Sequence, residues 1–440
     1  MREHFANCAF GTLDYIAYPA GMLLLAPAIL NVLGIDRFGI WAMANAVLMT
    51  GAILASGFGD ANIRSVAQAK GRGSGNEMVV TVRSAFGIHV ILGTFVAAAV
   101  WMAAPAITHL TVKTHEELAG DCLWSIRITS GLILLRAVET VCVSTQRAFC
   151  RYGTAIGVSV TARIVSVLLA WLVPVFKPSV TVVLGATFVA NGIALSIQMR
   201  QLKRLLGGGL LTPIVDSVTT KALLGFGVFT WMQAAAGLMA GQVDRLAAGF
   251  ALGASAVAVY TICVQLTQPI YGVTAAGLHF LFPLLASGSA RSSHPRLRRC
   301  IAVALAANFT FVAIGLASLL LFGRFILRHW VGITMADAAA EILPAAAWGS
   351  ALSALAVTGC YTLLAMGRPK AVAFLNIAGG LAMAGALPVL IPRFGLAGVA
   401  YGRLLPGCMA LLVYIPLTSQ IARQSMNSDS TNQLSIPEEA

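Results

Sequence analysis

The sequence predicts an all-α integral membrane protein with about 12 transmembrane helices. Of its 440 residues, 58% are hydrophobic and only 10% are charged, whereas soluble domains carry about 25% charged residues. Apolar runs close to the ~20 residues that a helix needs to cross a bilayer recur from one end of the chain to the other. The short stretches between these runs hold most of the basic residues, which is typical of loops beside a membrane.

The apolar runs define twelve expected spans, bounded by the points where polar residues interrupt them. They lie at about residues 12–33, 38–61, 84–104, 122–146, 154–175, 179–199, 222–242, 253–285, 301–322, 342–365, 371–391 and 396–418. A basic, glycine-rich stretch divides them into two sets of six. We therefore expect an N-terminal bundle over 1–199, a cytoplasmic linker over 200–221 and a C-terminal bundle over 222–418. The polar remainder, 419–440, is expected to be a disordered cytoplasmic tail.

The distribution of basic residues predicts the orientation. Eighteen of the 29 Lys and Arg residues fall on one side of this layout, seven fall on the other, and Arg127, Arg136, Arg163 and Arg403 lie within spans. The positive-inside rule then places both termini in the cytoplasm. The first ten residues lack the features of a removable signal peptide. The net charge of +13 is dispersed over many loops, so nucleic acid is not an expected partner.

A weak internal repeat supports the division into two halves. Leu33-Gly34 followed by Ile40-Trp41 recurs as Leu252-Gly253 followed by Val259-Tyr260, at an offset of 219 residues. Both halves begin on the cytoplasmic side, so the repeats are expected to be parallel, as in some transporter folds. The turn from Gly34 to Phe38 is expected to be an outer hairpin that both halves share.

Ionisable residues within the spans are the first candidates for function, because a charge inside a bilayer is costly and usually lines a cavity or pairs with another charge. Arg136 and Glu139 are three residues apart, so they share one face of the fourth span. Arg163 lies at a similar depth on the fifth span. Two interpretations remain open: a buried structural ion pair, or a positive wall that attracts an anion.

Other polar residues offer further candidates. Asp60 and Arg64 lie at the inner end of the second span and have no charged counterpart 219 residues later, which suggests a task of their own. Gln265, Gln268 and Tyr271 form a stripe on the eighth span. Hydrogen bonds between helices would also explain that stripe.

Motifs of catalysis and metal binding are absent from the sequence. It contains no Walker A motif, no GxSxG, no HExxH, no CxxC and no Cys/His cluster with zinc spacing. The longest expected outer loop, near 323–341, has no acid–base constellation. We therefore expect a protein that is not an enzyme, with no catalytic residues, no metal and no cofactor.

Three stretches carry a likeness to a known family: Leu33 to Trp41, Ser56 to Arg64, and Asp244-Arg245 leading to Val259-Tyr260. They resemble the Wzx-type polysaccharide flippases, the translocases of O-antigen and exopolysaccharide units, within the superfamily that also contains the MATE exporters and the lipid II flippases. Ala258 stands where the family usually has glycine. The resemblance covers the chain in length and in span number, although its motifs are degenerate.

The resemblance implies two six-helix bundles around a central cavity that opens alternately to each side of a bacterial inner membrane. It implies transport of an undecaprenyl-diphosphate-linked oligosaccharide to the periplasmic leaflet. Besides this substrate and the bilayer, a polysaccharide polymerase and a chain-length regulator are the implied partners. The candidates for binding the diphosphate are Arg64, Arg136, Arg163 and Arg403. The candidates for binding the sugar are Trp41, Tyr260, Gln265, Gln268 and Tyr271. The candidates for ion or proton coupling are Asp14, Asp60, Glu139 and Asp244.

Two other functions compete with this one. A MATE-like exporter of cationic drugs would need a net acidic cavity, whereas the embedded charges here are mostly positive. A membrane-bound polymerase or glycosyltransferase would be expected to have a larger or more acidic outer loop.

Overall fold

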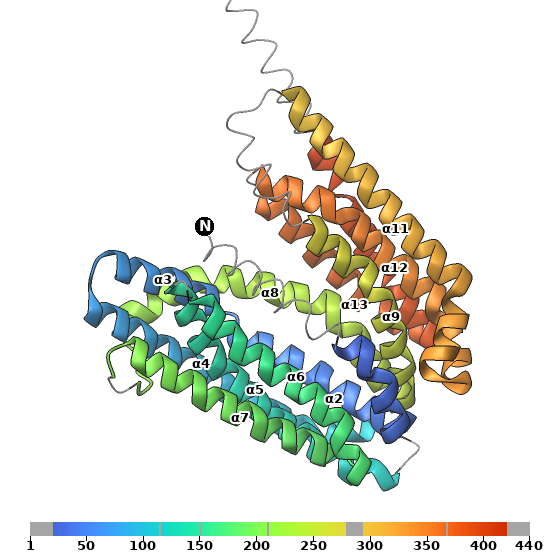
Figure 1. The fold of residues 1–440 in the computed structure, drawn as a ribbon, viewed down its shortest axis with the longest axis horizontal. Coiled ribbons are helices and arrows are strands. Elements are labelled where there is room, and N and C mark those ends of the chain that lie inside the picture. Colours follow the sequence, from blue (N-terminus) through green and yellow to red (C-terminus); the bar gives the residue numbers. More distant parts are fainter. Residues whose placement is uncertain are drawn as a thin grey trace, which may run out of the picture. The chain divides into compact units, whose positions relative to one another are not determined.

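The structure is a computed structural model, and it describes residues 21–113, 116–149, 151–208, 211–278, 294–366 and 368–419. Within these ranges the ordered elements are all helical (Figure 1). Eight helical segments are long and apolar enough to cross a membrane. Each expected span coincides at least in part with a helix, and the predicted class, an all-α multi-pass membrane protein, is confirmed.

The chain divides into two compact units. Unit 1 comprises Met1–Gln265 and Arg328–Ala339, and unit 2 comprises Leu266–Leu327 and Ala340–Ala440. Helix α8 therefore lies with unit 1, although the sequence suggests that the second half begins there. The domain boundaries expected from the sequence remain a prediction.

Unit 1 begins, in its described part, with a short helix over Gly21–Leu33. The helices that follow are α2 (Ile35–Ser56), α3 (Gly59–Gly71), α4 (Gly75–Thr111), the 3-10 turn η1 (Glu116–Leu118), α5 (Ala119–Ala148), α6 (Tyr152–Phe176), α7 (Val180–Leu205), α8 (Ser217–Leu252) and α9 (Ala254–Leu278), whose last part belongs to unit 2. Side chains cap two of these helices at their N-termini. Ser74 accepts a hydrogen bond from the Glu77 amide at the start of α4, and Asp216 accepts one from the Thr219 amide at the start of α8.

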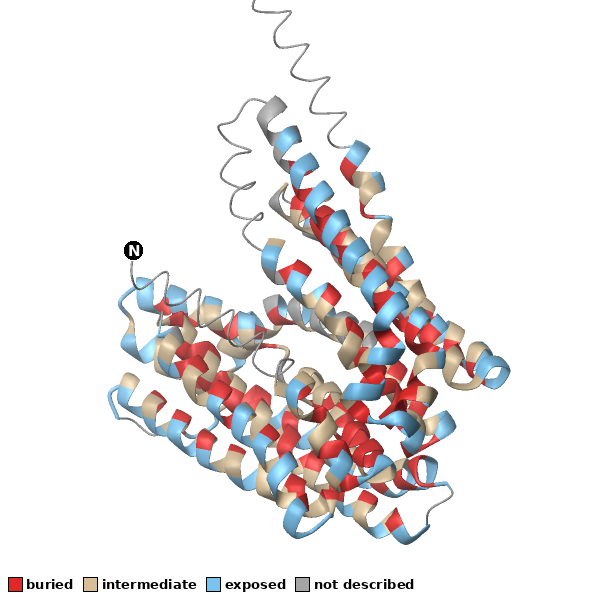
Figure 2. Cartoon of the chain, turned by 45° about the vertical axis from the view of Figure 1, so that its right-hand side comes forward, coloured by how far each residue is buried: buried red, intermediate tan, exposed pale blue. Residues whose placement is uncertain are grey.

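The core of unit 1 joins helices that are distant in the sequence. A buried apolar cluster brings together residues of α3, α4, α5, α7 and α8, among them Val66, Phe86, Val141, Leu202 and Leu223. In Figure 2 the buried residues lie mainly between the helices and the exposed ones on the outer faces. Large apolar side chains are among the exposed ones, as expected for helices whose outer faces meet lipid.

Unit 2 is built from the end of α9, most of α11 (His294–Val331) and α12 (Ile333–Ala365), and all of α13 (Pro369–Gly402) and α14 (Leu404–Leu411). The last residues of α11 and the first of α12, Arg328–Ala339, belong to unit 1. Its central cluster packs Ile270 of α9 against Leu316 of α11 and Ala351 of α12. The Asn308 side-chain amide on α11 donates to the hydroxyl of Thr358 on α12 over 3.0 Å. A second cluster joins α12 and α13 to the C-terminal helical segment through Leu363, Val372 and Val413.

Several expected boundaries differ from the structure. The turn expected over Gly34 to Phe38 is confined to Gly34, whose φ of 77° places it in the left-handed region that favours glycine. The second expected span breaks at Gly57-Phe58, and its polar end continues as α3. The loop expected near 323–341 is wrong, because α11 and α12 run through it and only Gly332, with φ 84°, interrupts them.

Helix α13 covers the eleventh expected span and the beginning of the twelfth, with a break inside it. Gly395 has φ 56° and ψ −131°, which is not helical. Beyond this break the chain turns back, because Gly379 lies against Pro406 and Gly402 lies against Leu387. The helix at the seventh expected span is also longer than predicted, because α8 continues past Asp244 to Leu252.

Candidate functional site

The hairpin of α5 and α6 places the first set of candidate residues. Only residues 149–151 separate the two helices, so they run antiparallel. The Ser159 hydroxyl on α6 donates to Oε1 of Glu139 on α5 over 2.7 Å, which fixes the register. Arg136 lies about 18 Å along α5 from its end, and Arg163 about 17 Å along α6 from its start, at 1.5 Å per residue. The similar depth expected for the two arginines follows from this register.

Arg136 and Glu139 form the ion pair that their spacing predicts. Nη1 of Arg136 donates to Oε2 of Glu139 over 2.7 Å, and the two side chains are 21% and 12% exposed. Glu139 therefore uses one oxygen for the arginine and the other for Ser159. Because a guanidinium has five N–H donors, a pair made through one nitrogen leaves most of the donors of Arg136 for another acceptor.

The polar cluster extends from this pair to α7. The side-chain amide of Gln198 on α7 donates to the Ala155 carbonyl over 2.9 Å and to the Ser159 hydroxyl over 3.3 Å. Gln146 on α5 donates in turn to Oε1 of Gln198 over 2.5 Å. Such connected networks hold their members in one arrangement. The network that includes the Glu139 carboxylate thus joins three helices, with Ser159 linking the carboxylate to Gln198 on α7.

The sequence interpretation missed Ser159, Gln146 and Gln198. Each lies within an apolar helix and is buried, and each alone is an ordinary membrane-helix residue. The sequence does contain one signal, since Gln146 and Gln198 both carry side-chain amides near the same end of α5 and α7. That these amides contact each other could not be inferred without the packing of the two helices.

Asp60 and Arg64 lie on the exposed side of α3, one helical turn apart. Between them, the buried Asn62 donates to the hydroxyls of Ser144 and Thr145 on α5 over 2.7 and 2.9 Å. Asp60 occupies the first turn of α3, where the helix dipole favours a negative charge. The structure therefore holds this segment against α5 by its buried face and presents Asp60 and Arg64 outward.

Asp244 and Tyr260 form a second buried polar pair in unit 1. Both residues are fully buried, and the Tyr260 hydroxyl donates to Oδ2 of Asp244 over 2.6 Å. The Arg245 amide donates to Oδ1 of the same carboxylate over 2.8 Å. Trp41 is also buried, and its ring lies 5.7 Å from that of Phe38. The proposed contacts of Trp41 and Tyr260 with a sugar stay a prediction.

The remaining described candidates lie on α9 and at the end of α13. Gln265, Gln268 and Tyr271 share α9, where Tyr271 is 39% exposed and the Oε1 atom of Gln265 is buried without a hydrogen-bond partner among the described residues. Arg403 caps the C-terminus of α13 in unit 2 and packs beside Gly349. Asp14 lies outside the described residues. Across the described ranges, no group of His, Cys, Asp and Glu side chains could hold a metal ion.

Long apolar helices with a charged network held inside one unit define a multi-pass membrane protein. The sequence model of the polysaccharide biosynthesis protein family matches residues 9–289, and the chain belongs to this family. The Wzx-like family predicted from the sequence is thereby confirmed. No curated protein sequence matches the chain.

Solved structures show the same fold at low sequence identity. An inward-facing multidrug resistance MATE family transporter of the MOP superfamily is 16% identical, with a TM-score of 0.74 over 95% of this chain and 99% of that one. The lipid II flippase MurJ, in an inward closed conformation, is 13% identical, with a TM-score of 0.72 over 99% and 94%. A eukaryotic MATE transporter is 15% identical, with a TM-score of 0.61 over 97% and 99%. The chain therefore has the fold of the MATE and MurJ transporters.

Proposed function

We propose that this protein moves an undecaprenyl-diphosphate-linked oligosaccharide from the cytoplasmic to the periplasmic leaflet of a bacterial inner membrane by alternating access. Its polysaccharide biosynthesis family supports the substrate class, and MurJ, which shares the fold, is named as a flippase for lipid II. The orientation from charge counting, with both termini in the cytoplasm, belongs to the same proposal, as do the polymerase and the chain-length regulator as protein partners.

One observation supports the site more than any other. Arg136 lies deep in an apolar unit and is bound to Glu139 through a single nitrogen. An arginine in this arrangement suits a phosphate, because its planar fork can donate two parallel hydrogen bonds. Arg163, at a similar depth on the adjoining helix, adds a second positive charge. In this proposal Arg136 and Arg163 bind the diphosphate, Glu139 positions Arg136, and Arg64 meets the substrate at the cytoplasmic end.

The other candidates have secondary roles in the proposal. Arg403 is a further contact for the diphosphate, and the sugar is bound by Trp41, Tyr260, Gln265, Gln268 and Tyr271. Coupling to a proton or ion is assigned to Asp60 and Glu139 first, with Asp14 and Asp244 as the other carboxylates. The fold does not distinguish a flippase from a MATE-like exporter, since both classes share it; the family favours the flippase.

The test is transport of lipid-linked sugar in cells that lack the gene and any paralogue. Oligosaccharide that reaches the outer leaflet is labelled from outside, and membrane abundance of each variant is measured alongside. We expect Arg136→Ala and Arg163→Ala to abolish labelling while both variants remain in the membrane. Arg200→Ala is the matched control, because Arg200 is an exposed arginine on α7 outside this network. Normal labelling without the protein, or wild-type transport in both variants, would refute the function or the site, respectively.

A further inference from the structure

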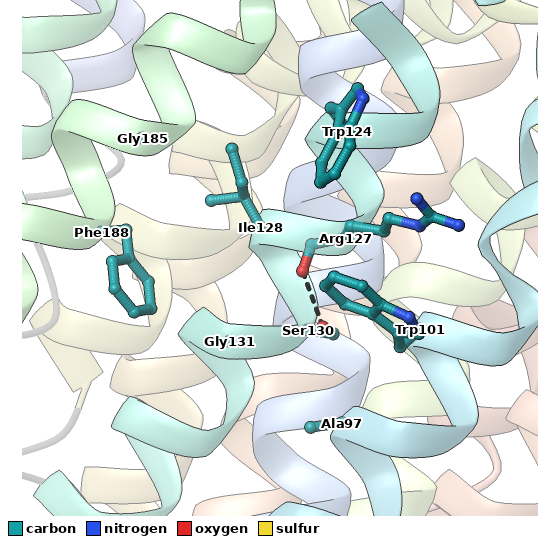
Figure 3. Close-up of a pocket in the computed structure, with 9 residues that line it drawn as sticks. All are labelled: Ala97, Trp101, Trp124, Arg127, Ile128, Ser130, Gly131, Gly185 and Phe188. Carbon is teal, nitrogen blue, oxygen red and sulfur yellow. Dashed lines mark hydrogen bonds between the residues drawn. The ribbon is translucent and has the colours of Figure 1, made fainter. Parts of the chain in front are cut away.

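A pocket outside the α5–α6–α7 network opens on the surface of unit 1 where α4, α5 and α7 meet (Figure 3). It has a volume of about 360 Å³, within the ~300–1,000 Å³ of small-ligand pockets. Its lining is almost entirely apolar, with Phe188 and Gly185 contributed by α7 and Gly131 by α5. The one charged group in it is Arg127, a residue that the proposed transport mechanism does not use.

Arg127 is held between two tryptophans. Its guanidinium carbon lies 5.0 Å from the ring centre of Trp101 on α4 and 5.1 Å from that of Trp124 on α5, and Figure 3 shows the group between the two indoles. Cation–π contacts use the faces of a guanidinium, whereas its N–H donors point along its edge. The Nε atom is buried without a hydrogen-bond partner among the described residues. The terminal nitrogens Nη1 and Nη2 are not among the buried atoms, so they are the donors that an anion from outside can reach, and a hydrogen bond from a charged donor is stronger than a neutral one.

The pocket has room for an apolar chain beside that cation. Apart from the adjoining backbone of its own helix, no atom lies within 4 Å of the point where a side chain at Gly185 would begin. The Ser130 hydroxyl, the other polar side chain of the lining, is turned to the Arg127 carbonyl and donates to it over 2.6 Å. Arg127 is therefore the polar end of an otherwise apolar site, which matches the chemistry of a lipid with an anionic headgroup.

The position in the chain fits the edge of a bilayer. Trp101 lies three residues before the end of the expected span 84–104, and Trp124 lies two residues after the start of the expected span 122–146. The two indoles are 46% and 50% exposed, and tryptophans at the ends of spans lie at the level of lipid headgroups. By the charge-based orientation this is the outer end of the spans.

We infer that this pocket is a structural binding site for an anionic glycerophospholipid of the outer leaflet. The phosphate lies at the edge of Arg127 between the indoles, and one acyl chain fills the pocket over Gly185 and Phe188. The bound lipid holds α4, α5 and α7 together at that end. The site is separate from the Arg136 network and does not depend on what the protein transports.

The experiment measures lipid binding to the purified full-length protein by native mass spectrometry, with thermal stability measured in parallel. The probe is dioleoyl-phosphatidylglycerol; dioleoylglycerol and inorganic phosphate are tested separately to distinguish the acyl chain and a free anion from the whole lipid. Two variants disrupt the site: Arg127→Gln removes the charge, and Gly185→Leu fills the pocket. Their matched controls are Arg200→Gln, an exposed arginine elsewhere, and Gly192→Leu, which also has open space around it on the same helix.

We expect Arg127→Gln to weaken phosphatidylglycerol binding about tenfold or more, as for loss of a charged hydrogen bond. We expect a similar loss, about tenfold, from Gly185→Leu, which removes the burial of roughly two methylenes. Both controls should bind as the wild type does. Arg127→Lys keeps the charge and should bind the lipid better than Arg127→Gln does. This difference would show that the loss in Arg127→Gln does not come from a general folding defect. Equal binding by all variants would overturn the inference. So would equal binding of dioleoylglycerol, or the same stabilisation by inorganic phosphate alone.

Discussion

The Oδ1 atom of Asp36 accepts a hydrogen bond of 2.5 Å from the Ser255 hydroxyl, although the two residues are 219 positions apart. The same number separates the two copies of the internal repeat. The backbone is repeated as well: Gly34 and Gly253 have φ angles of 77° and 91°. Their amides donate to Leu30 and Gly249, which are also 219 residues apart. The starts of α2 and α9 are therefore equivalent turns that meet each other.

The contact between the two repeats should contribute to stability. Asp36→Ala and Ser255→Ala each remove one partner, so each should lower the thermal stability of the protein in detergent. Because the pair is exposed, the cost of either change is expected near the low end of about 0.5–1.5 kcal/mol. The double variant should be no less stable than the worse single variant, since both remove the same bond. Fully additive losses in the thermal-shift measurement would show that the two side chains act independently.

Gly39 allows a close approach between α2 and the start of α9. A methyl group at Gly39 would overlap the carbonyl oxygen of Ala254, which is backbone and cannot turn aside. Gly39→Ala should therefore destabilise the protein by about 1–3 kcal/mol, the cost of overpacking. Gly192→Ala is the control, because a methyl group there meets no atom within 4 Å. Equal melting temperatures for the two variants would mean that the turns separate without cost.

The sequence predicted the helices and the repeat because both depend on local patterns. Apolar runs of bilayer length are visible without any packing, and Gly34 and Gly253 mark turns that need a left-handed backbone. The boundaries were less accurate where a helix continues beyond the apolar run. The residues around Gly332 look like a polar outer loop, but helices α11 and α12 extend through them, since the length of a helix is not limited by that of its apolar part.

Only the contacts of the candidate site that lie within one helix were predicted from the sequence. The pairing of Arg136 with Glu139 follows from a spacing of three residues on one helix, and the structure contains it. The contacts of Glu139 with Ser159 and of Gln198 with Gln146 join separate helices, so they depend on which helix faces are in contact. Burial of Trp41 and Tyr260 could not be deduced either, since an aromatic side chain in an apolar run can face lipid, line a cavity or pack in the protein core.

Asp121, which lies just before the expected span 122–146, joins the start of α5 to the start of α7. Its carboxylate accepts hydrogen bonds from the Ser179 hydroxyl and from the amides of Val180 and Thr181 over 2.7–2.9 Å. Burial raises the pKa of Asp121, but the hydrogen bonds from Thr181, Ser179 and Val180 together lower it below the ordinary value of 3.8. The charged form is thus favoured by folding.

The lowered pKa predicts how stability depends on pH. The contribution of Asp121 is fully present above its unfolded pKa of about 3.9 and is lost as the pH falls through the lower folded value. Melting temperatures between pH 3 and 7 should show this loss in the wild type. Asp121→Asn should be less stable at neutral pH and should lose less on acidification. If the melting temperatures of the wild type and of Asp121→Asn fall by the same amount on acidification, other carboxylates cause the acid sensitivity.

The Arg136–Glu139 pair can be tested for a role beyond structure. Glu139→Gln leaves the positive charge of Arg136 uncompensated in a largely apolar surrounding, so it should destabilise the protein and stop transport. Because both side chains retain some exposure, the loss should be smaller than the ~3–5 kcal/mol of a fully buried pair. Adding Arg136→Gln removes the lone charge, so the double variant should regain most of the stability.

Transport is the measurement that separates the two interpretations of this pair. If Arg136 binds the diphosphate, the restabilised double variant remains inactive in the outside-labelling assay, because its phosphate-binding donors are gone. If the pair only holds α5 against α6, recovery of stability brings recovery of transport. We expect the first result, since Arg136 is held through one nitrogen and keeps its other donors for a ligand. Substituting Arg200 in the same assay provides the control for loss of a positive charge outside the network.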